Sequence, residues 1–134
     1  MKDFHFDAIA AFENYEIDTM RDGHVVVTTK VVESSLNYYG NAHGGYLFTL
    51  CDQISGLVVI SQGVDGVTLQ SSINYLKAGR LGDVLTIHGE CVHSGRTTRV
   101  VDVDITNQDG ANVCKATFTM FVTGERDESA KVRI

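Results

Sequence analysis

The 134-residue sequence contains no proline and only three cysteines. Because no proline-rich or low-complexity stretch marks a linker and no repeat is present, we expect residues 1–134 to form a single domain. The cysteines are odd in number and lack C-x-x-C spacing, which argues against a disulfide framework and a structural zinc site. We therefore expect reduced thiols in a cytoplasmic protein.

Positive charge and long apolar runs are also scarce. The formal net charge of −6 disfavours nucleic acid as a partner, because an acidic domain repels phosphate backbones. The N-terminus lacks the apolar run of a signal peptide, and the most apolar stretch, 46–60, is too short to span a bilayer, so we expect no membrane attachment. With 43% hydrophobic residues, the chain nevertheless has enough apolar side chains for a core.

The hydrophobic pattern predicts one long helix, 44–62, that is apolar on nearly every side and therefore buried all round. Strand-like segments surround it in the sequence, at 15–20, 25–32, 67–76, 84–94, 97–107 and 112–123. Glycine-containing pairs typical of tight hairpins lie at 22–23, 94–95 and 109–110. We also expect an N-terminal arm over 1–14 with a short helix at 7–13, and a frayed charged tail over 125–134.

This order of elements predicts an α+β fold in which one antiparallel sheet wraps around a buried central helix. Such a sheet covers only one side of the helix. The apolar surface that remains needs a second subunit, so we expect a homo-oligomer that is at least a dimer.

The most informative stretch is the loop that leads into the helix. Gly44 and Gly45 open the helix, where backbone N–H groups lack intrahelical partners and, with the helix dipole, suit a developing oxyanion. Asp52 lies in mid-helix, where an aspartate neither favours the helix nor caps it. It is either an active-site carboxylate or an aspartate that is hydrogen-bonded to a neighbouring loop or subunit.

Spacing constrains how these groups work together. Gly44 and Asp52 are eight residues apart, or about 12 Å along a helix at 1.5 Å per residue, so one carbonyl cannot touch both. Two helices that lie antiparallel across a two-fold axis would bring Gly44 of one close to Asp52 of the other. The spacing therefore predicts active sites shared between subunits.

The pattern N-x-x-G-x-x-H-G-G at 37–45, with Asp52 eight residues after its first paired glycine, resembles the PaaI-type (phenylacetic acid degradation) acyl-CoA thioesterases of the hotdog superfamily. The resemblance extends from residue 23 to about residue 122. It implies a hotdog fold, often assembled as a tetramer, and hydrolysis of acyl-CoA. Coenzyme A would be part of the substrate, and no separate cofactor is implied.

The resemblance also implies roles for individual residues. Asp52 would act as general base or nucleophile, and Gly44, with Gly45 behind it, would polarise the thioester carbonyl. Asn37 would position the water or the thioester. His43 would brace the loop or contact the thioester region, and Thr68 would orient the water.

Other residues have two interpretations each. Tyr38, Tyr39 and Phe48 flank the motif and would line a pocket for an aromatic or medium-length acyl group, although core packing explains Phe48 equally well. Arg80 and Arg96 belong to a cluster of basic residues at turns, which would contact coenzyme A phosphates or simply be solvated.

Three alternatives compete with hydrolysis at Asp52. His43 and Cys51 could form a nucleophilic pair, but they are also about 12 Å apart along the helix, and a structural thiol fits better. The fold could instead serve a hydratase or dehydratase, or a non-catalytic acyl-CoA-binding module. The other histidines show no metal-ligand spacing, so we expect no metal.

Overall fold

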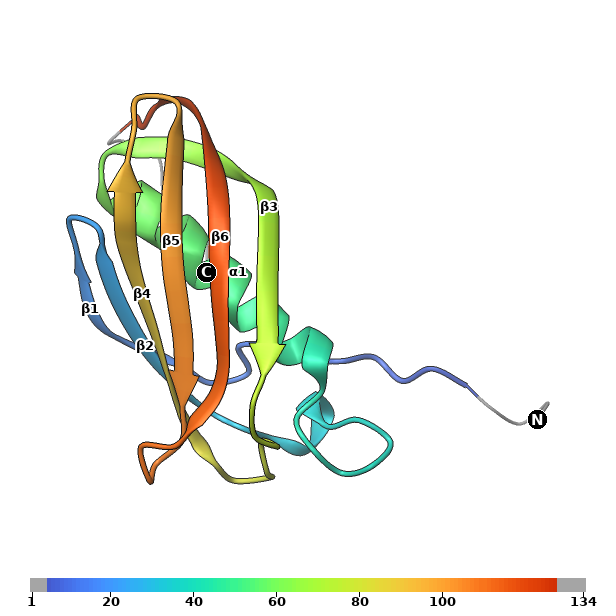
Figure 1. The fold of residues 1–134 in the computed structure, drawn as a ribbon. Coiled ribbons are helices and arrows are strands. Elements are labelled where there is room, and N and C mark those ends of the chain that lie inside the picture. The colour runs from blue at the N-terminus through green and yellow to red at the C-terminus, as the bar shows by residue number, and fades with distance from the viewer. Residues whose placement is uncertain (1–4, 128–134) are drawn as a thin grey trace.

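In the computed structural model, which describes residues 5–127, six antiparallel strands curl around one long helix (Figure 1). The elements are β1 (Glu16–Arg21), β2 (His24–Lys30), the 3-10 turn η1 (Glu33–Ser35), α1 (Gly44–Ser61), β3 (Val64–Tyr75), β4 (Val84–Ser94), β5 (Thr98–Thr106) and β6 (Asn112–Glu125). The strand order is β1-β2-β4-β5-β6-β3, so β1 and β3 are the edges of the sheet. The predicted α+β fold, one sheet wrapped around one helix, is confirmed.

The inner face of the sheet and the helix together form the core. In β5, Val101, Val103 and Ile105 are at most 2% exposed, whereas Asp102 and Asp104 lie on the outer face. This is the period-2 pattern of a strand with one dry and one wet face. The alternation predicted for this segment is therefore confirmed.

A glycine in the sheet sets how closely the helix approaches. A Cβ on Gly89 of β4 would lie only 2.7 Å from Ile54 Cγ2 and 3.0 Å from Val58 Cγ2 of α1. Both helix side chains are fully buried. The absence of a side chain at this position allows α1 to rest directly on the middle of the sheet.

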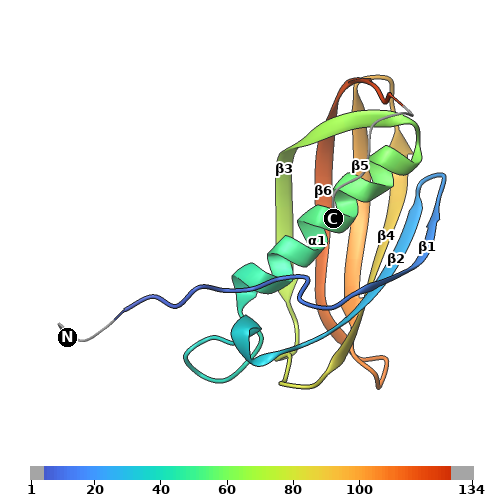
Figure 2. The same cartoon turned by 180° about the vertical axis from the view of Figure 1, so that it is seen from behind.

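The sequence predicted a helix that is buried all round, and within one chain this prediction is wrong. Seen from behind, α1 lies in front of the sheet and one of its sides is uncovered (Figure 2). Gly45, Thr49 and Gln53 are exposed along this side, and Asp52 and Gly56 are half-buried. These polar or small residues recur with helical periodicity, and the many leucines, valines and isoleucines between them obscure the stripe in the sequence.

By length and composition, α1 also passes the test for a membrane span, since it has 18 residues with a mean hydropathy of 1.2. It is longer than the apolar stretch 46–60 considered in the sequence. Core helices of globular proteins pass the same test. Half of this window is buried inside the fold, against the inner face of the sheet.

The chain termini differ from the prediction. No helix forms at 7–13, because the segment is tied to the η1 turn: Ala10 N–H donates to Ser34 O at 3.0 Å, and Ser35 Oγ donates to Ala10 O at 2.9 Å. At the other end, β6 continues to Glu125, and Arg126 pairs with Asp65, so the chain does not fray from 125. Residues 128–134, the rest of the predicted tail, lie outside the described residues, as do residues 1–4 of the arm.

Candidate active site

The start of α1 is capped by a histidine. His43 has the extended backbone of an N-cap (φ −64°, ψ 136°), and its Nδ1 accepts a hydrogen bond from Gly45 N–H at 2.8 Å. This bond requires an unprotonated Nδ1. Within residues 5–127, no hydrogen bond uses the N–H of Gly44. Gly45 is therefore occupied structurally. Among the described residues, the first-turn N–H groups of Gly44 and Tyr46 take part in no such bond, and of these two residues Gly44 lines the cavity beside the loop.

The loop before the helix is organised by Asn37. Its Oδ1 accepts hydrogen bonds from the backbone N–H groups of Tyr39 and Asn41, both at 3.0 Å. Gly40 has a φ of 77°, the left-handed conformation that favours glycine. Because Oδ1 is engaged in the turn, the side-chain NH₂ of Asn37 is the group left to meet a ligand.

Asn37 and Gly44 come together at one cavity of about 350 Å³. Tyr75 and Lys77, which follow one another closely at the end of β3, also line it. The hydroxyl of Tyr75 donates a hydrogen bond to Gly44 O at 2.9 Å. The sequence prediction missed Tyr75, whereas Lys77 belongs to the basic residues at turns that were considered for coenzyme A phosphates. The alternation of β3 was the available signal, because it directs Tyr75 to the inner face with Ile73.

Asp52 forms a second group with Thr68. Thr68 Oγ1 donates to Asp52 Oδ1 at 2.7 Å, a short bond typical of a hydroxyl and a carboxylate. Asp52 lies on the uncovered side of α1 and is half-buried rather than enclosed by apolar groups. Thr68 lies on the edge strand β3, opposite Met120 of β6.

The chain thus brings the predicted catalytic residues together in two groups. One contains Asn37, His43, Gly44 and Gly45 at the start of α1, and the other contains Asp52 and Thr68 two turns later. The groups are about 12 Å apart along the axis of the regular helix between Gly44 and Asp52. A single carbonyl cannot contact both groups within one chain.

The predicted pocket residues differ in their surroundings. Tyr38 and Tyr39 are 63% and 88% exposed, and Tyr38 lines a second cavity of about 260 Å³ together with His43. Phe48 instead packs against Phe118, with ring centroids 5.5 Å apart, as part of the core. Core packing therefore explains Phe48 within one chain.

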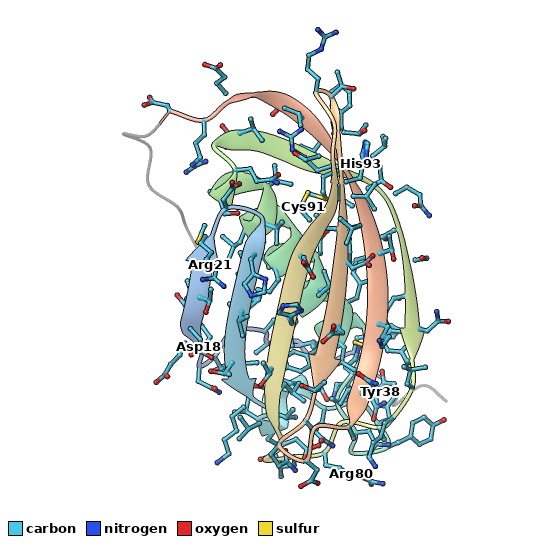
Figure 3. The ribbon with its side chains drawn as sticks, turned by 60° about the vertical axis from the view of Figure 1, so that its left-hand side comes forward. Asp18, Arg21, Tyr38, Arg80, Cys91 and His93 are labelled. Carbon is cyan, nitrogen blue, oxygen red and sulfur yellow. The ribbon has the colours of Figure 1, made fainter. Side chains whose placement is uncertain are left out.

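The basic residues at the turns do not form one cluster. Arg80 precedes β4 and Arg96 follows it, so this 11-residue strand separates them by roughly 35 Å at about 3.3 Å per residue. Figure 3 shows Arg80 at the lower end of the sheet and His93, near the last residues of β4, at the upper end. Arg80 Nη1 approaches Asn41 Oδ1 at 3.4 Å, beside the loop before α1. The prediction of one basic cluster is therefore wrong for a single chain.

The remaining cysteines and histidines show no reactive arrangement. The thiols of Cys51 and Cys114 are fully buried and 4.0 Å apart. The hydrogen bond that the Cys51 thiol donates to Cys114 and burial both raise the pKa of Cys51, which keeps it protonated and unreactive. Cys51 is thus a structural thiol. Within the described residues, no three His, Cys, Asp or Glu side chains gather as metal ligands would.

Comparisons of the sequence give consistent matches. The family model described as Thioesterase superfamily matches residues 39–114, which include Gly44, Asp52 and Thr68. The Escherichia coli acyl-coenzyme A thioesterase PaaI is 36% identical over 107 residues, or 80% of this chain and 76% of that protein. The solved structure of E. coli PaaI matches with a TM-score of 0.80 and 33% identity, over 83% of this chain and 80% of that one.

Structures of two streptococcal proteins are more similar. A hypothetical thioesterase from Streptococcus pneumoniae TIGR4, solved with coenzyme A, has a TM-score of 0.91 and 87% identity over 92% of this chain and 100% of that one. Its Asp52→Ala and Thr68→Ala variants, at 87% identity, match with TM-scores of 0.89 and 0.90, over 90% and 91% of this chain and 100% of theirs. The smu.793 protein from Streptococcus mutans UA159, bound to acetyl CoA, has a TM-score of 0.85 and 67% identity over 92% and 100% of the two chains.

Proposed function

This chain belongs to the thioesterase superfamily and is an acyl-CoA thioesterase with the hotdog fold, and from that premise we propose that it hydrolyses aromatic (phenylacetyl-like) or medium-chain acyl-CoA at active sites shared between two subunits. The main support for sharing is the distance between the two groups of polar residues. Asp52 with Thr68 and Gly44 with Asn37 are too far apart in one chain to act on one carbonyl.

The edge strand β3 offers a surface for the second subunit. As the last strand in the order, it has no partner strand on one side of its 12-residue backbone among residues 5–127. Large apolar side chains beside this edge are exposed, among them Val67 (55%), Leu69 (63%) and Phe121 (43%). A long, apolar, unpaired edge favours pairing with another strand. A second copy that paired through β3 about a two-fold axis would run the two α1 helices antiparallel, with Asp52 of each approaching Gly44 of the other.

In such a site the chemistry follows from the groups present. The thioester oxygen accepts the hydrogen bond of Gly44 N–H in one subunit, and Asp52 of the partner subunit takes a proton from a water that attacks the carbonyl carbon. Thr68 holds one oxygen of that carboxylate and leaves the other to face the water. The tetrahedral intermediate then expels coenzyme A as a thiolate, which receives the proton from Asp52, and the free acid remains.

Direct attack of the same carboxylate on the carbonyl carbon is the second possible route, through an acyl anhydride. A single turnover in ¹⁸O-labelled water tests for this route. Label in the side chain of Asp52 would reveal an anhydride that water opens at the aspartyl carbonyl, whereas general-base catalysis leaves Asp52 unlabelled and puts the label in the product acid.

The surroundings of the loop support the choice of substrate. The cavity of about 260 Å³ at the loop is lined by Phe6, Ile9, Leu36 and Tyr38, with the polar residues Asp7, Asn37 and His43 among them. Such a lining favours an aromatic ring or a medium-length alkyl chain. Arg80, at the same end of the molecule as the loop, is our candidate for a coenzyme A phosphate contact, whereas Arg96 would reach that ligand only from another subunit.

A panel of acyl-CoAs, from acetyl to palmitoyl and including phenylacetyl, tests the function with a thiol reagent that reports released coenzyme A. We expect the highest kcat/KM for phenylacetyl and medium chains, and a loss of activity of about 100-fold or more in Asp52→Asn. Asp102→Asn is the matched control, because Asp102 also accepts a hydrogen bond from a threonine but lies on the outer face of the sheet. Full turnover by Asp52→Asn would contradict the proposed site.

The same panel of acyl-CoAs also distinguishes hydrolysis from the competing functions. Tight binding of acyl-CoA without thiol release would favour a binding module. A change at the α,β bond of the acyl group without thiol release would favour a hydratase. Preference for acetyl or palmitoyl groups would leave hydrolysis intact and overturn the proposed acyl specificity.

A further inference from the structure

We propose that Tyr75 is a positioning residue of this active site: its hydroxyl fixes the Gly44–Gly45 peptide and thereby holds the N–H of Gly44 in its catalytic direction. The proposal rests on the proposed function, in which Gly44 N–H binds the thioester oxygen. Two successive glycines are the most flexible start that a helix can have, because neither has a Cβ to restrict its backbone. A donor placed there needs support from elsewhere.

The peptide between the two glycines is held at both ends by side chains. Tyr75 OH donates to the carbonyl oxygen of Gly44 at 2.9 Å, and His43 Nδ1 accepts from the N–H of Gly45 at 2.8 Å. The tyrosine ring also lies against Gly44, since a Cβ built on this glycine would be 3.4 Å from Tyr75 Cζ. The free N–H of Gly44 belongs to the preceding His43–Gly44 peptide, which joins the anchored peptide at Cα of Gly44. Without the two side-chain bonds, Cα of Gly44 and the N–H attached to that residue would be free to shift together.

Tyr75 is itself firmly placed by the sheet. It pairs with Cys114 at the end of β3, and the next two backbone N–H groups, those of Leu76 and Lys77, both donate to Val113 O, at 2.8 and 3.2 Å. The hydroxyl therefore links the helix start to a fixed point on β6 through the end of β3. Burial raises the pKa of Tyr75, so its hydroxyl remains a donor at neutral and mildly alkaline pH.

A purely structural role accounts poorly for this hydrogen bond. The carbonyl of Gly44 lies in the first turn of α1, where it is also the acceptor for the helical N–H four residues later. Tyr75 is only partly buried, at 50% exposure, and its bond to Gly44 O lies at an exposed position, so water can replace Gly44 as the partner of the hydroxyl. The bond therefore lies outside the helix's own hydrogen-bond ladder and acts on the first peptide of α1, next to the donor of Gly44.

Tyr75→Phe keeps the ring and removes the hydroxyl. We expect kcat to fall about 3- to 10-fold with KM nearly unchanged, because the loss falls on an interaction that strengthens in the transition state. The melting temperature should stay close to that of the wild type. Tyr15→Phe is the matched control, because Tyr15 packs edge-on against Phe12 at a different part of the molecule, and it should leave kcat unchanged.

A spectroscopic measurement follows the peptide itself. Gly44–Gly45 is the only Gly-Gly pair in the sequence, so protein made with glycine labelled with ¹³C at the carbonyl and ¹⁵N gives one HNCO cross-peak, which reports this peptide alone. We expect the carbonyl carbon of Gly44 to shift upfield in Tyr75→Phe and to stay in place in Tyr15→Phe.

The two measurements together decide the proposal. An unmoved cross-peak in Tyr75→Phe would overturn it, and so would a moved cross-peak with unchanged kcat. Failure of the proposed function looks different, since Asp52→Asn would then hydrolyse acyl-CoA at the wild-type rate. A moved cross-peak with reduced kcat and unchanged KM supports the positioning role.

Discussion

The hydroxyl of Thr68 can be removed with little change in shape by replacing Thr68 with valine. It donates to Asp52 Oδ1 at 2.7 Å, and without it the carboxylate is free to rotate away from the position that faces the substrate. A hydrogen bond to a charged group contributes about 1.5–3 kcal/mol. If most of that energy is expressed in the transition state, kcat should fall about 10- to 100-fold, at roughly 1.4 kcal/mol for each factor of ten.

The assay is release of coenzyme A from one acyl-CoA under saturating conditions, with kcat and KM measured for each variant. Thr68→Ser retains a hydroxyl and should recover most of the rate. Thr117→Val is the matched control, because Thr117 Oγ1 donates to Asp102 Oδ1 at 3.1 Å in a similar Thr–Asp pair on the outer face of the sheet. Both pairs are exposed, so neither change should alter the free energy of unfolding by much.

The reasoning is refuted if Thr68→Val and Thr117→Val have the same kcat. It is also refuted if Thr68→Ser is as slow as Thr68→Val, since the hydroxyl would then not be the group that matters. A rise in KM alone would place Thr68 in substrate binding and not in orienting Asp52.

Two further predictions concern stability and reactivity. Gly89→Ala should lower the free energy of unfolding by about 1–3 kcal/mol, because its Cβ would meet a buried side chain at 2.7 Å. Gly56→Ala has open space around its Cβ and should raise the free energy of unfolding by about 0.5–1 kcal/mol. Urea unfolding measures both, and equal effects would contradict this account of the packing. At pH 8 a thiol reagent should modify Cys91 alone in the native protein and all three cysteines after denaturation. The reason is that Cys51 and Cys114 are buried and hydrogen-bonded to each other. Rapid reaction of a second thiol in the native protein would contradict this prediction.

Much of the fold was predictable because the sheet has a regular period. The segment 84–94 was predicted with the bounds that β4 has in the structure, and the alternation of β5 identified its core face. The N-terminal segment was not predictable in the same way. Its backbone bonds to residues of the η1 turn more than twenty positions away, and such distant partners override a local tendency towards helix.

The residues of the candidate site also fall into those that local sequence features reveal and those that depend on contacts distant in the sequence. Gly44 and Asp52 stood out because glycines at a helix start and a carboxylate in mid-helix are locally unfavourable choices. Tyr75 did not, because a tyrosine in a strand is ordinary and its contact with Gly44 joins elements 31 positions apart. Arg96 was grouped with Arg80 on sequence proximity to turns, although the strand between them makes those turns opposite ends of the sheet.

Sharing of active sites between subunits is tested most directly by purified heterodimers. A dimer of an Asp52→Ala chain with a Gly44→Pro chain would contain one site with both changes and one with neither, so it should show about half of the wild-type activity. The control pairs a wild-type chain with a chain that carries both changes. Each of its sites would contain one change, and it should be inactive.

The opposite pattern would contradict the account. If Asp52 and Gly44 of the same chain form each site, the first heterodimer should be inactive, and the control should retain about half of the wild-type activity.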